Sequence, residues 1–104
     1  MSAKIRFTES ALGDLEGIRA WYAEQGVGDV GARLVGDIIE RIEHLADYPD
    51  MGRVVPEFGQ NALRELVHPP FRIVYRRDSG VVRIVRVWRG ERQLGLAVNE
   101  DGAS

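Results

Sequence analysis

The chain contains no cysteine, and it has no apolar run approaching the roughly 20 residues that cross a membrane. The lack of cysteine excludes a disulfide framework and thiolate metal sites, which fits a reducing compartment. The opening residues, Met1 to Phe7, lack the apolar core of a signal peptide. We therefore expect a cytoplasmic protein without membrane contact.

The composition excludes a disordered chain, because 44% of the residues are hydrophobic and 29% are charged. The length of 104 residues predicts a single domain over residues 1–104. A chain of this size buries roughly 60 to 70% of its unfolded surface, so it folds without covalent or metal cross-links.

Charge is divided unevenly along the chain. The formal net charge is −2, yet residues 63–94 carry eight arginines against three acidic residues and contain no lysine. Residues 1–62 instead carry six basic and eleven acidic side chains. This division indicates that one face meets an acidic partner, either a nucleic-acid backbone or an acidic protein segment.

The first half of the chain predicts a strand and two helices. Residues 4–7 alternate polar and apolar side chains, as a short strand does. Thr8 is a plausible N-cap for a helix to about Glu24, and Gly26 can end it in the left-handed conformation. Gly28 and Asp29 predict a turn and a second N-cap, so the two helices run antiparallel. The apolar stripes are Ala11, Leu15, Ile18 and Tyr22, then Val35, Ile38, Ile39, Ile42 and Leu45.

The second half predicts a loop and three strands. The second helix should stop near Tyr48, because Pro49 disfavours helical geometry in the residue before it. Residues 54–61 read as a loop and residues 62–67 as a strand. Residues 71–77 and 81–89 form a β-hairpin around Asp78-Ser79-Gly80. The prediction is an α+β fold, a strand and a helical hairpin followed by a three-stranded antiparallel meander with the helices on one sheet face.

Alternation along the first hairpin strand places Phe71, Ile73 and Tyr75 toward the helices. Arg72 and Arg76 then occupy the helix-free face, where we expect a basic concavity with at least one later arginine. The second hairpin strand is apolar on both sides, so its register stays open. Surface arginines often only solvate a sheet, which fits Arg76 and Arg77 next to the turn. Arg72 and Arg92 are better candidates, because a guanidinium group can hold a phosphate or a carboxylate with two hydrogen bonds.

Several segments of the chain carry short motifs in a defined order and spacing. The first helix carries A-x-x-D-L-x-x-I-x-x-W-Y from Ala11 to Tyr22, and the second exits through L-x-x-x-P-x-M-G-R from Leu45 to Arg53. The later segments that match are R-E-L at residues 64–66, F-R-I-V-Y at residues 71–75 and V-W-R-G-E-R-Q-L at residues 87–94. In their order and spacing, these segments resemble the RelE/ParE superfamily of type II toxin-antitoxin toxins.

The resemblance implies one of two activities. RelE-like members are ribosome-dependent mRNA endonucleases that use lysines, arginines and a C-terminal tyrosine or histidine. On that alternative the candidate catalytic residues are Arg72, Arg92, Arg64, Glu65 and His68. Residues 63–66 lack lysine, and residues 95–104 lack tyrosine and histidine. Arginine is a poor proton shuttle, so a general acid or base is missing.

ParE-like members act on DNA gyrase without a nucleolytic centre, and the resemblance favours this branch. It implies a toxin of the plasmid-stabilization type, neutralised by a cognate antitoxin in a hetero-oligomer, that arrests growth through gyrase. A degenerate module that only binds antitoxin is a further alternative. No cofactor is expected, and the spacing of His44 and His68 gives no metal motif. The expected binding residues are Arg72, Arg76, Arg83, Arg86, Trp88, Arg89 and Arg92.

Overall fold

The computed structural model describes residues 2–90. Two helices pack on a five-stranded mixed sheet, which confirms the predicted α+β fold. None of the helices in this part of the chain is long and apolar enough to cross a membrane. In chain order the elements are β1 (Lys4–Phe7), α1 (Glu9–Glu24), α2 (Gly28–Glu43), the short 3-10 helix η1 (His44–Ala46), β2 (Arg53–Val54), β3 (Leu63–His68), β4 (Phe71–Asp78) and β5 (Val81–Arg89).

The strands lie in the order β1-β5-β4-β3-β2. The predicted antiparallel meander is confirmed as β3, β4 and β5, and β1 joins it in parallel along β5. β2 pairs with β3 at the other edge and was missed in the sequence. Its two residues, Arg53 and Val54, are too few to show a period and lie between turn-forming segments.

The helix ends follow the predicted signals with one exception. The Thr8 hydroxyl accepts a hydrogen bond from the Ala11 amide, which confirms this N-cap, and Gly26 has a φ of 80° between the helices. The predicted second N-cap was wrong, because Val27 occupies that position and Asp29 lies within the first turn of α2. The helix proper ends at Glu43, and η1 carries the chain on toward Tyr48.

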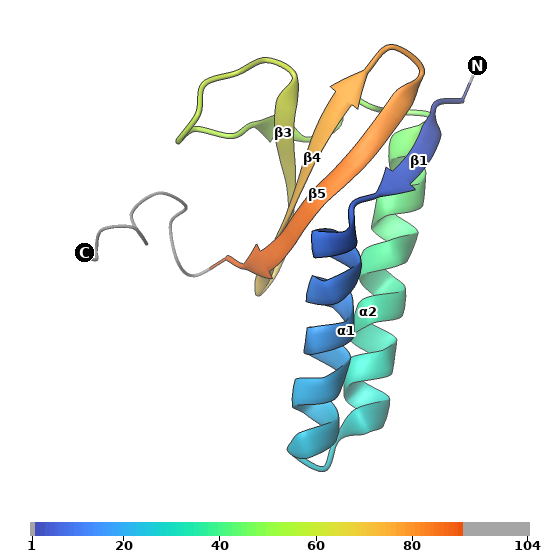
Figure 1. Ribbon diagram of the computed structural model, residues 1–104, viewed down its shortest axis with the longest axis vertical. Coiled ribbons are helices and arrows are strands. Elements are labelled where there is room, and N and C mark those ends of the chain that lie inside the picture. The colour runs from blue at the N-terminus through green and yellow to red at the C-terminus, as the bar shows by residue number, and fades with distance from the viewer. Residues whose placement is uncertain (1, 91–104) are drawn as a thin grey trace.

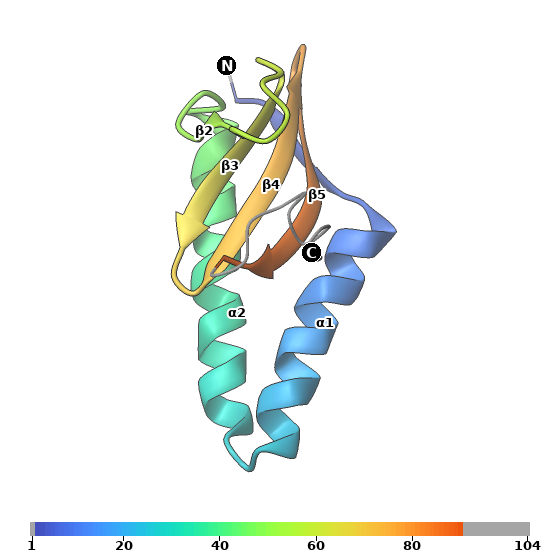
Figure 2. The ribbon, with the colours of Figure 1, turned by 90° about the vertical axis from the view of Figure 1, so that its left-hand side faces the viewer.

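The main core lies between the helical hairpin and one face of the sheet. Figures 1 and 2 show both helices on this face, with their lower halves projecting past the end of the sheet. Both predicted apolar stripes supply the core, although Tyr22 and Ile39 are only partly buried. The sheet contributes Leu66, Phe71, Ile73, Tyr75, Val82, Ile84 and Val87, which confirms the predicted orientation of the first hairpin strand.

A β-bulge explains why β5 is apolar on both sides. Tyr75 pairs with Ile84 and Val74 pairs with Arg86, so Val85 is an extra residue in β5. The bulge shifts the alternation by one, and both Ile84 and Val87 therefore face the helices. Arg86 and Trp88 consequently lie on the opposite side, which we call the open face.

Tyr75 fastens the exit from the helices to the sheet. Its hydroxyl donates a hydrogen bond to the Pro49 carbonyl at 2.7 Å and accepts one from the Gly52 amide at 2.9 Å. A Cβ on residue 52 would lie 2.5 Å from the Glu65 carbonyl oxygen, so only glycine fits there. Burial raises the pKa of Tyr75 above its usual value, which outweighs the opposing effect of the Gly52 amide.

The close approach of α2 to α1 at Gly31 can be tested with two glycines of α2. A Cβ on residue 31 would lie 2.7 Å from the Tyr22 Cβ, whereas a Cβ on residue 36 would meet no atom within 4 Å. We expect Gly31→Ala to lower the free energy of unfolding by about 1 to 3 kcal/mol through overpacking. Gly36→Ala should raise it by up to about 1 kcal/mol, because alanine favours the helix. Urea unfolding of both variants measures the difference, and equal effects would contradict the close crossing.

Alkaline pH should destabilise the protein through Tyr75. Because the pKa of Tyr75 is raised in the folded protein, its contribution to the free energy of unfolding is complete below the tyrosine pKa of the unfolded chain, near 10. This contribution is lost as the pH rises through the pKa of Tyr75 in the folded protein. Tyr75→Phe should cost about 1 to 3 kcal/mol at pH 7, because the Gly52 amide loses its partner. The variant should also lose less stability than the parent above pH 10. Denaturant unfolding at pH 7, 9 and 10.5 tests both expectations.

Candidate partner-binding surfaces

Arg72 lies on the open face, the helix-free side of the sheet that was predicted for it, but it is buried in a network of four charged side chains. Its Nε donates a hydrogen bond to Glu65 at 2.6 Å, and its two terminal nitrogens donate to the two carboxylate oxygens of Glu57 at 3.1 Å each. The second oxygen of Glu65 accepts from Arg53 at 2.6 Å. The side chains of Arg72 and Glu65 are 7% and 0% exposed. We call these four residues the ion-pair network.

The network is electrically balanced, since it holds two arginines and two glutamates. Burial lowers the pKa of Arg72, but its hydrogen bonds and charge interactions with Glu57 and Glu65 raise it above the ordinary arginine value. The guanidinium group stays charged, and carboxylates occupy its hydrogen-bonding positions. Arg72 is therefore not available to a phosphate while the network is intact.

A second apolar cluster further modifies the predicted basic concavity. Val55 and Val74 are buried on the open face, with Leu63, Val85 and Trp88 packed against them. The open face is therefore covered near its middle and is not a continuous basic surface. Arg76 and Arg83 remain exposed on it, toward the β4–β5 turn.

Of the other candidate nuclease residues that the structure describes, Glu65 contacts Arg72, whereas Arg64 and His68 lie elsewhere. Arg64 donates hydrogen bonds to the Gly52 carbonyl at 3.0 Å and to the Asn61 side chain at 2.9 Å. His68 lies opposite Phe71 in the register, on the helix side of the sheet. Arg92 lies outside the described residues. Within residues 2–90 no three potential metal-ligating side chains come together.

Arg86 and Trp88 form a structural group at the free edge of β5. One oxygen of Asp14 accepts hydrogen bonds from the Arg86 Nε and the Val87 amide, both at 2.8 Å. The guanidinium carbon of Arg86 lies 4.7 Å from the Trp88 ring centre, a cation–π distance. The hydrogen bond to Asp14 raises the pKa of Arg86 against the effect of burial. Asp14 thus fixes α1 to β5 beyond the end of β1.

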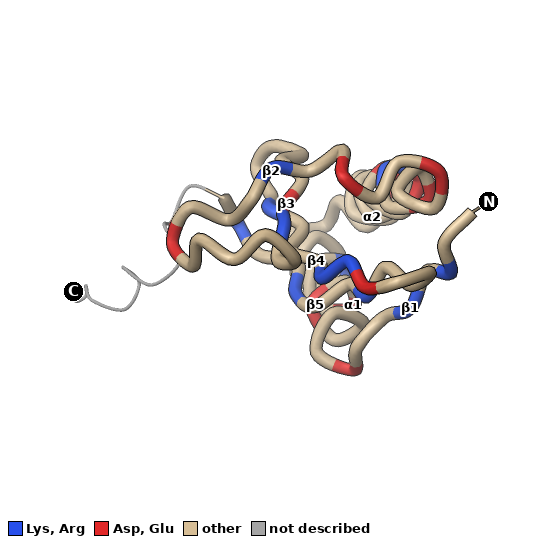
Figure 3. The backbone as a smooth tube through the Cα atoms, turned by 90° about the horizontal axis from the view of Figure 1, so that it is seen from above, with Lys and Arg blue, Asp and Glu red and all other residues tan. Residues whose placement is uncertain are grey.

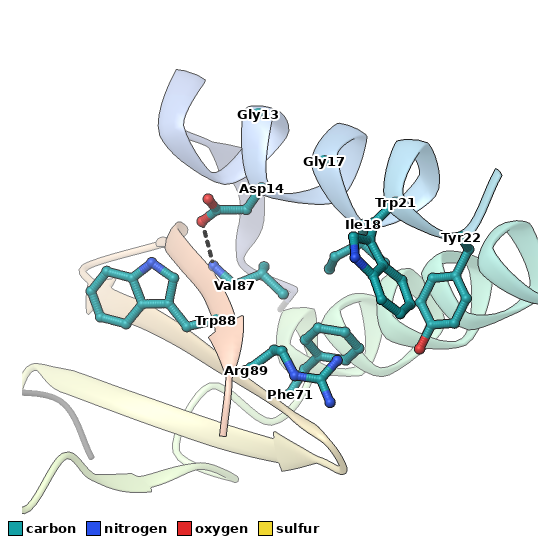
Figure 4. Close-up of a pocket in the computed structure, with 10 residues that line it drawn as sticks. All are labelled: Gly13, Asp14, Gly17, Ile18, Trp21, Tyr22, Phe71, Val87, Trp88 and Arg89. Carbon is teal, nitrogen blue, oxygen red and sulfur yellow. Dashed lines mark hydrogen bonds between the residues drawn. The ribbon is translucent and has the colours of Figure 1, made fainter. Parts of the chain in front are cut away.

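An apolar groove of about 480 Å³ lies between α1 and the last residues of β5. Figure 4 shows Trp21 and Tyr22 from α1 on one side, with Phe71 and Arg89 from the sheet opposite them. The Arg89 guanidinium lies 5.6 Å from the Phe71 ring centre. The complete lining is Gly13, Asp14, Gly17, Ile18, Trp21, Tyr22, Phe71, Val87, Trp88 and Arg89. We call this surface the α1–β5 groove.

The floor of the groove has features that packing within the chain does not explain. A Cβ on Gly13 or Gly17 would meet no atom within 4 Å, so neither glycine serves a close contact. Glycine within a helix costs roughly 0.5 to 1 kcal/mol relative to alanine. Trp21 is 51% exposed beside them. This surface was not predicted from the sequence, although Gly13, Gly17 and Trp21 recur every four residues beside the core stripe.

Comparison with known proteins agrees with this architecture. The family model described as ParE toxin of type II toxin-antitoxin system, parDE, matches residues 5–94. The chain therefore belongs to the ParE toxin family of type II toxin-antitoxin systems. A search of curated protein sequences finds no match.

Two solved structures share the fold. The chromosomal ParDE system from P. aeruginosa matches with a TM-score of 0.72 and 23% identity, over 85% of this chain and 96% of that one. The toxin-antitoxin complex RelBE2 from Mycobacterium tuberculosis matches with a TM-score of 0.64 and 20% identity, over 86% of this chain and 99% of that one.

The ion-pair network predicts unequal costs for its members. Arg72→Ala leaves Glu65 buried with a single partner and should lower the free energy of unfolding by about 3 to 5 kcal/mol. Glu57 is the more exposed partner, with 19% side-chain exposure. Glu57→Gln should cost less than about 1 kcal/mol. Urea unfolding distinguishes the two, and a loss below 1 kcal/mol for Arg72→Ala would contradict a stabilising network.

Proposed function

We propose that this chain is a growth-arresting toxin that inhibits DNA gyrase and is neutralised by a cognate antitoxin. The observation that carries the gyrase assignment is the pairing of Arg72 with Glu57 and Glu65. A ribonuclease needs a group that transfers protons close to a cation that stabilises phosphate charge. Here the central arginine is neutralised, and His68 lies on the other side of the sheet. This arrangement favours action by binding over cleavage of RNA.

The antitoxin, in this proposal, covers the α1–β5 groove with an apolar segment. The solved relative from P. aeruginosa is a ParDE system, and the one from M. tuberculosis is a toxin-antitoxin complex. The groove suits such a segment because its floor is two glycines and its walls carry aromatic rings. Burial of apolar surface of this kind against a partner removes it from water and stabilises the complex.

The target can be tested by measuring two activities side by side. Purified protein should inhibit supercoiling by gyrase and leave ribosome-bound mRNA intact. Ribosome-dependent cleavage with no effect on gyrase would overturn the assignment and support the endonuclease alternative. Tight antitoxin binding without either activity would identify a module that only binds its partner.

The groove can be tested by filling its floor. Gly17→Leu places a large side chain in the groove, and Gly36→Leu places the same side chain on an exposed face of α2 with open space around it. Co-expression with the cognate antitoxin should rescue growth for Gly36→Leu. Rescue should fail for Gly17→Leu, with antitoxin affinity lowered at least tenfold in a pull-down titration. Equal affinities for the two folded variants would exclude the groove as the antitoxin site.

A further inference from the structure

Three arginines lie side by side across three adjacent strands near the β4–β5 turn. Arg6 of β1 is in register with Arg83 of β5, and Arg83 is in register with Arg76 of β4. Adjacent strands are about 4.8 Å apart, so the row spans roughly 10 Å. We call these residues the arginine row. Arg76 and Arg83 were predicted from the sequence as binding residues but Arg6 was not, because nothing in the sequence shows which strand lies beside β5.

All three side chains project from the open face. Ile5 and Phe7 flank Arg6 and pack against the main core, and Val82 and Ile84 flank Arg83 in the same way. Tyr75, next to Arg76, is also in that core. Since neighbouring residues of a strand point to opposite faces, the three arginines point away from the helices. All three are exposed.

The row has no acidic partner among the described residues. The ion pairs of the open face involve Arg53, Arg72 and Arg86 instead. Like charges placed directly opposite in a sheet destabilise it, so the row costs stability within the free protein. Lys4 and Asp78 lie at the next level of the register, on either side of Val81. The local formal charge of this end of the open face is therefore +3.

The charge of the ion-pair network is balanced and that of the two helices is negative, unlike the charge at this end. The ion-pair network on the same face is balanced, and the two helices carry eight acidic residues against three arginines. Figure 3, which views the molecule from above, shows basic positions on β1 and β4 and acidic positions along α2. An extended polyanion would be held at the arginine row and repelled by the helices.

We propose that the arginine row binds the phosphate backbone of double-stranded DNA without sequence specificity. Guanidinium groups bind phosphates with two hydrogen bonds, and three in a line match a run of phosphates along a duplex. On the three strands that carry the row, Trp88 is the single aromatic side chain of the open face, and it already contacts Arg86 and the cluster around Val74. These three strands, as the structure describes them, therefore offer no free aromatic platform for unstacked bases beside the row, which favours a duplex over a single strand. This activity is separate from inhibition of gyrase and does not depend on it.

The binding test uses a fluorescently labelled 20-base-pair duplex of arbitrary sequence and the purified full chain. Anisotropy measured between 25 and 150 mM salt should give a slope of log K against log salt of about −3, from roughly three phosphate contacts. Arg76→Gln/Arg83→Gln should reduce the slope to about −1 and weaken binding at least tenfold at 25 mM salt. The control Arg19→Gln/Arg33→Gln removes the same charge from exposed positions on α1 and α2.

The control should bind the duplex within twofold of the parent chain. Equal losses for the two double variants would overturn the proposal, because the effect would then follow net charge alone. Absence of binding by the parent chain at 25 mM salt would also overturn it, as would tighter binding to a single strand of the same length. If polyglutamate binds through the row and the duplex does not, the partner is an acidic protein and the assignment to DNA is wrong. Circular dichroism checks that all variants fold.

Discussion

The arrangement of β2, β3 and β4 on the open face depends on the buried contact between Arg72 and Glu65. Glu65 is 1% exposed and joins β3 to both of its neighbours, through Arg53 in β2 and Arg72 in β4. A buried carboxylate is tolerable only when its charge is matched and its oxygens accept hydrogen bonds. The contact with Glu57 extends this pairing to the loop after β2. One electrostatic requirement therefore holds the edge strand and its loop on the sheet, and it also removes Arg72 from contact with other anions.

Most of the fold was accessible from the sequence, because its strongest signals are local. Helical stripes, the Thr8 cap and the turn at Gly26 each depend on neighbours within a few residues, and the structure places them as predicted. The features that were missed depend on long-range pairing. β2 is a strand only because it pairs with β3. The bulge at Val85 is defined only by the register of β5 against β4.

The candidate binding surfaces were harder to predict from the sequence than the fold, and for a related reason. The sequence identified an excess of arginine and assigned Arg72 to the correct face, but the partner of each arginine lies far along the chain. Arg86 pairs with a residue of α1, and Arg72 pairs with residues of β3 and of the preceding loop. The Pro-x-Met-Gly-Arg exit shows the reverse case, where a motif noticed for its resemblance has a physical cause. Gly52 fits beneath Tyr75, and Arg53 binds Glu65.

The bulge at Val85 affects how relatives of this chain can be compared. Residues 86–89 keep their faces only while β5 contains one residue more than β4 over the same span. A relative that lacks this residue would carry the side chain aligned with Trp88 toward the helices and the one aligned with Arg89 toward the open face. Residue roles at the end of β5 therefore cannot be transferred by alignment alone, and the strand register has to be established first in each relative.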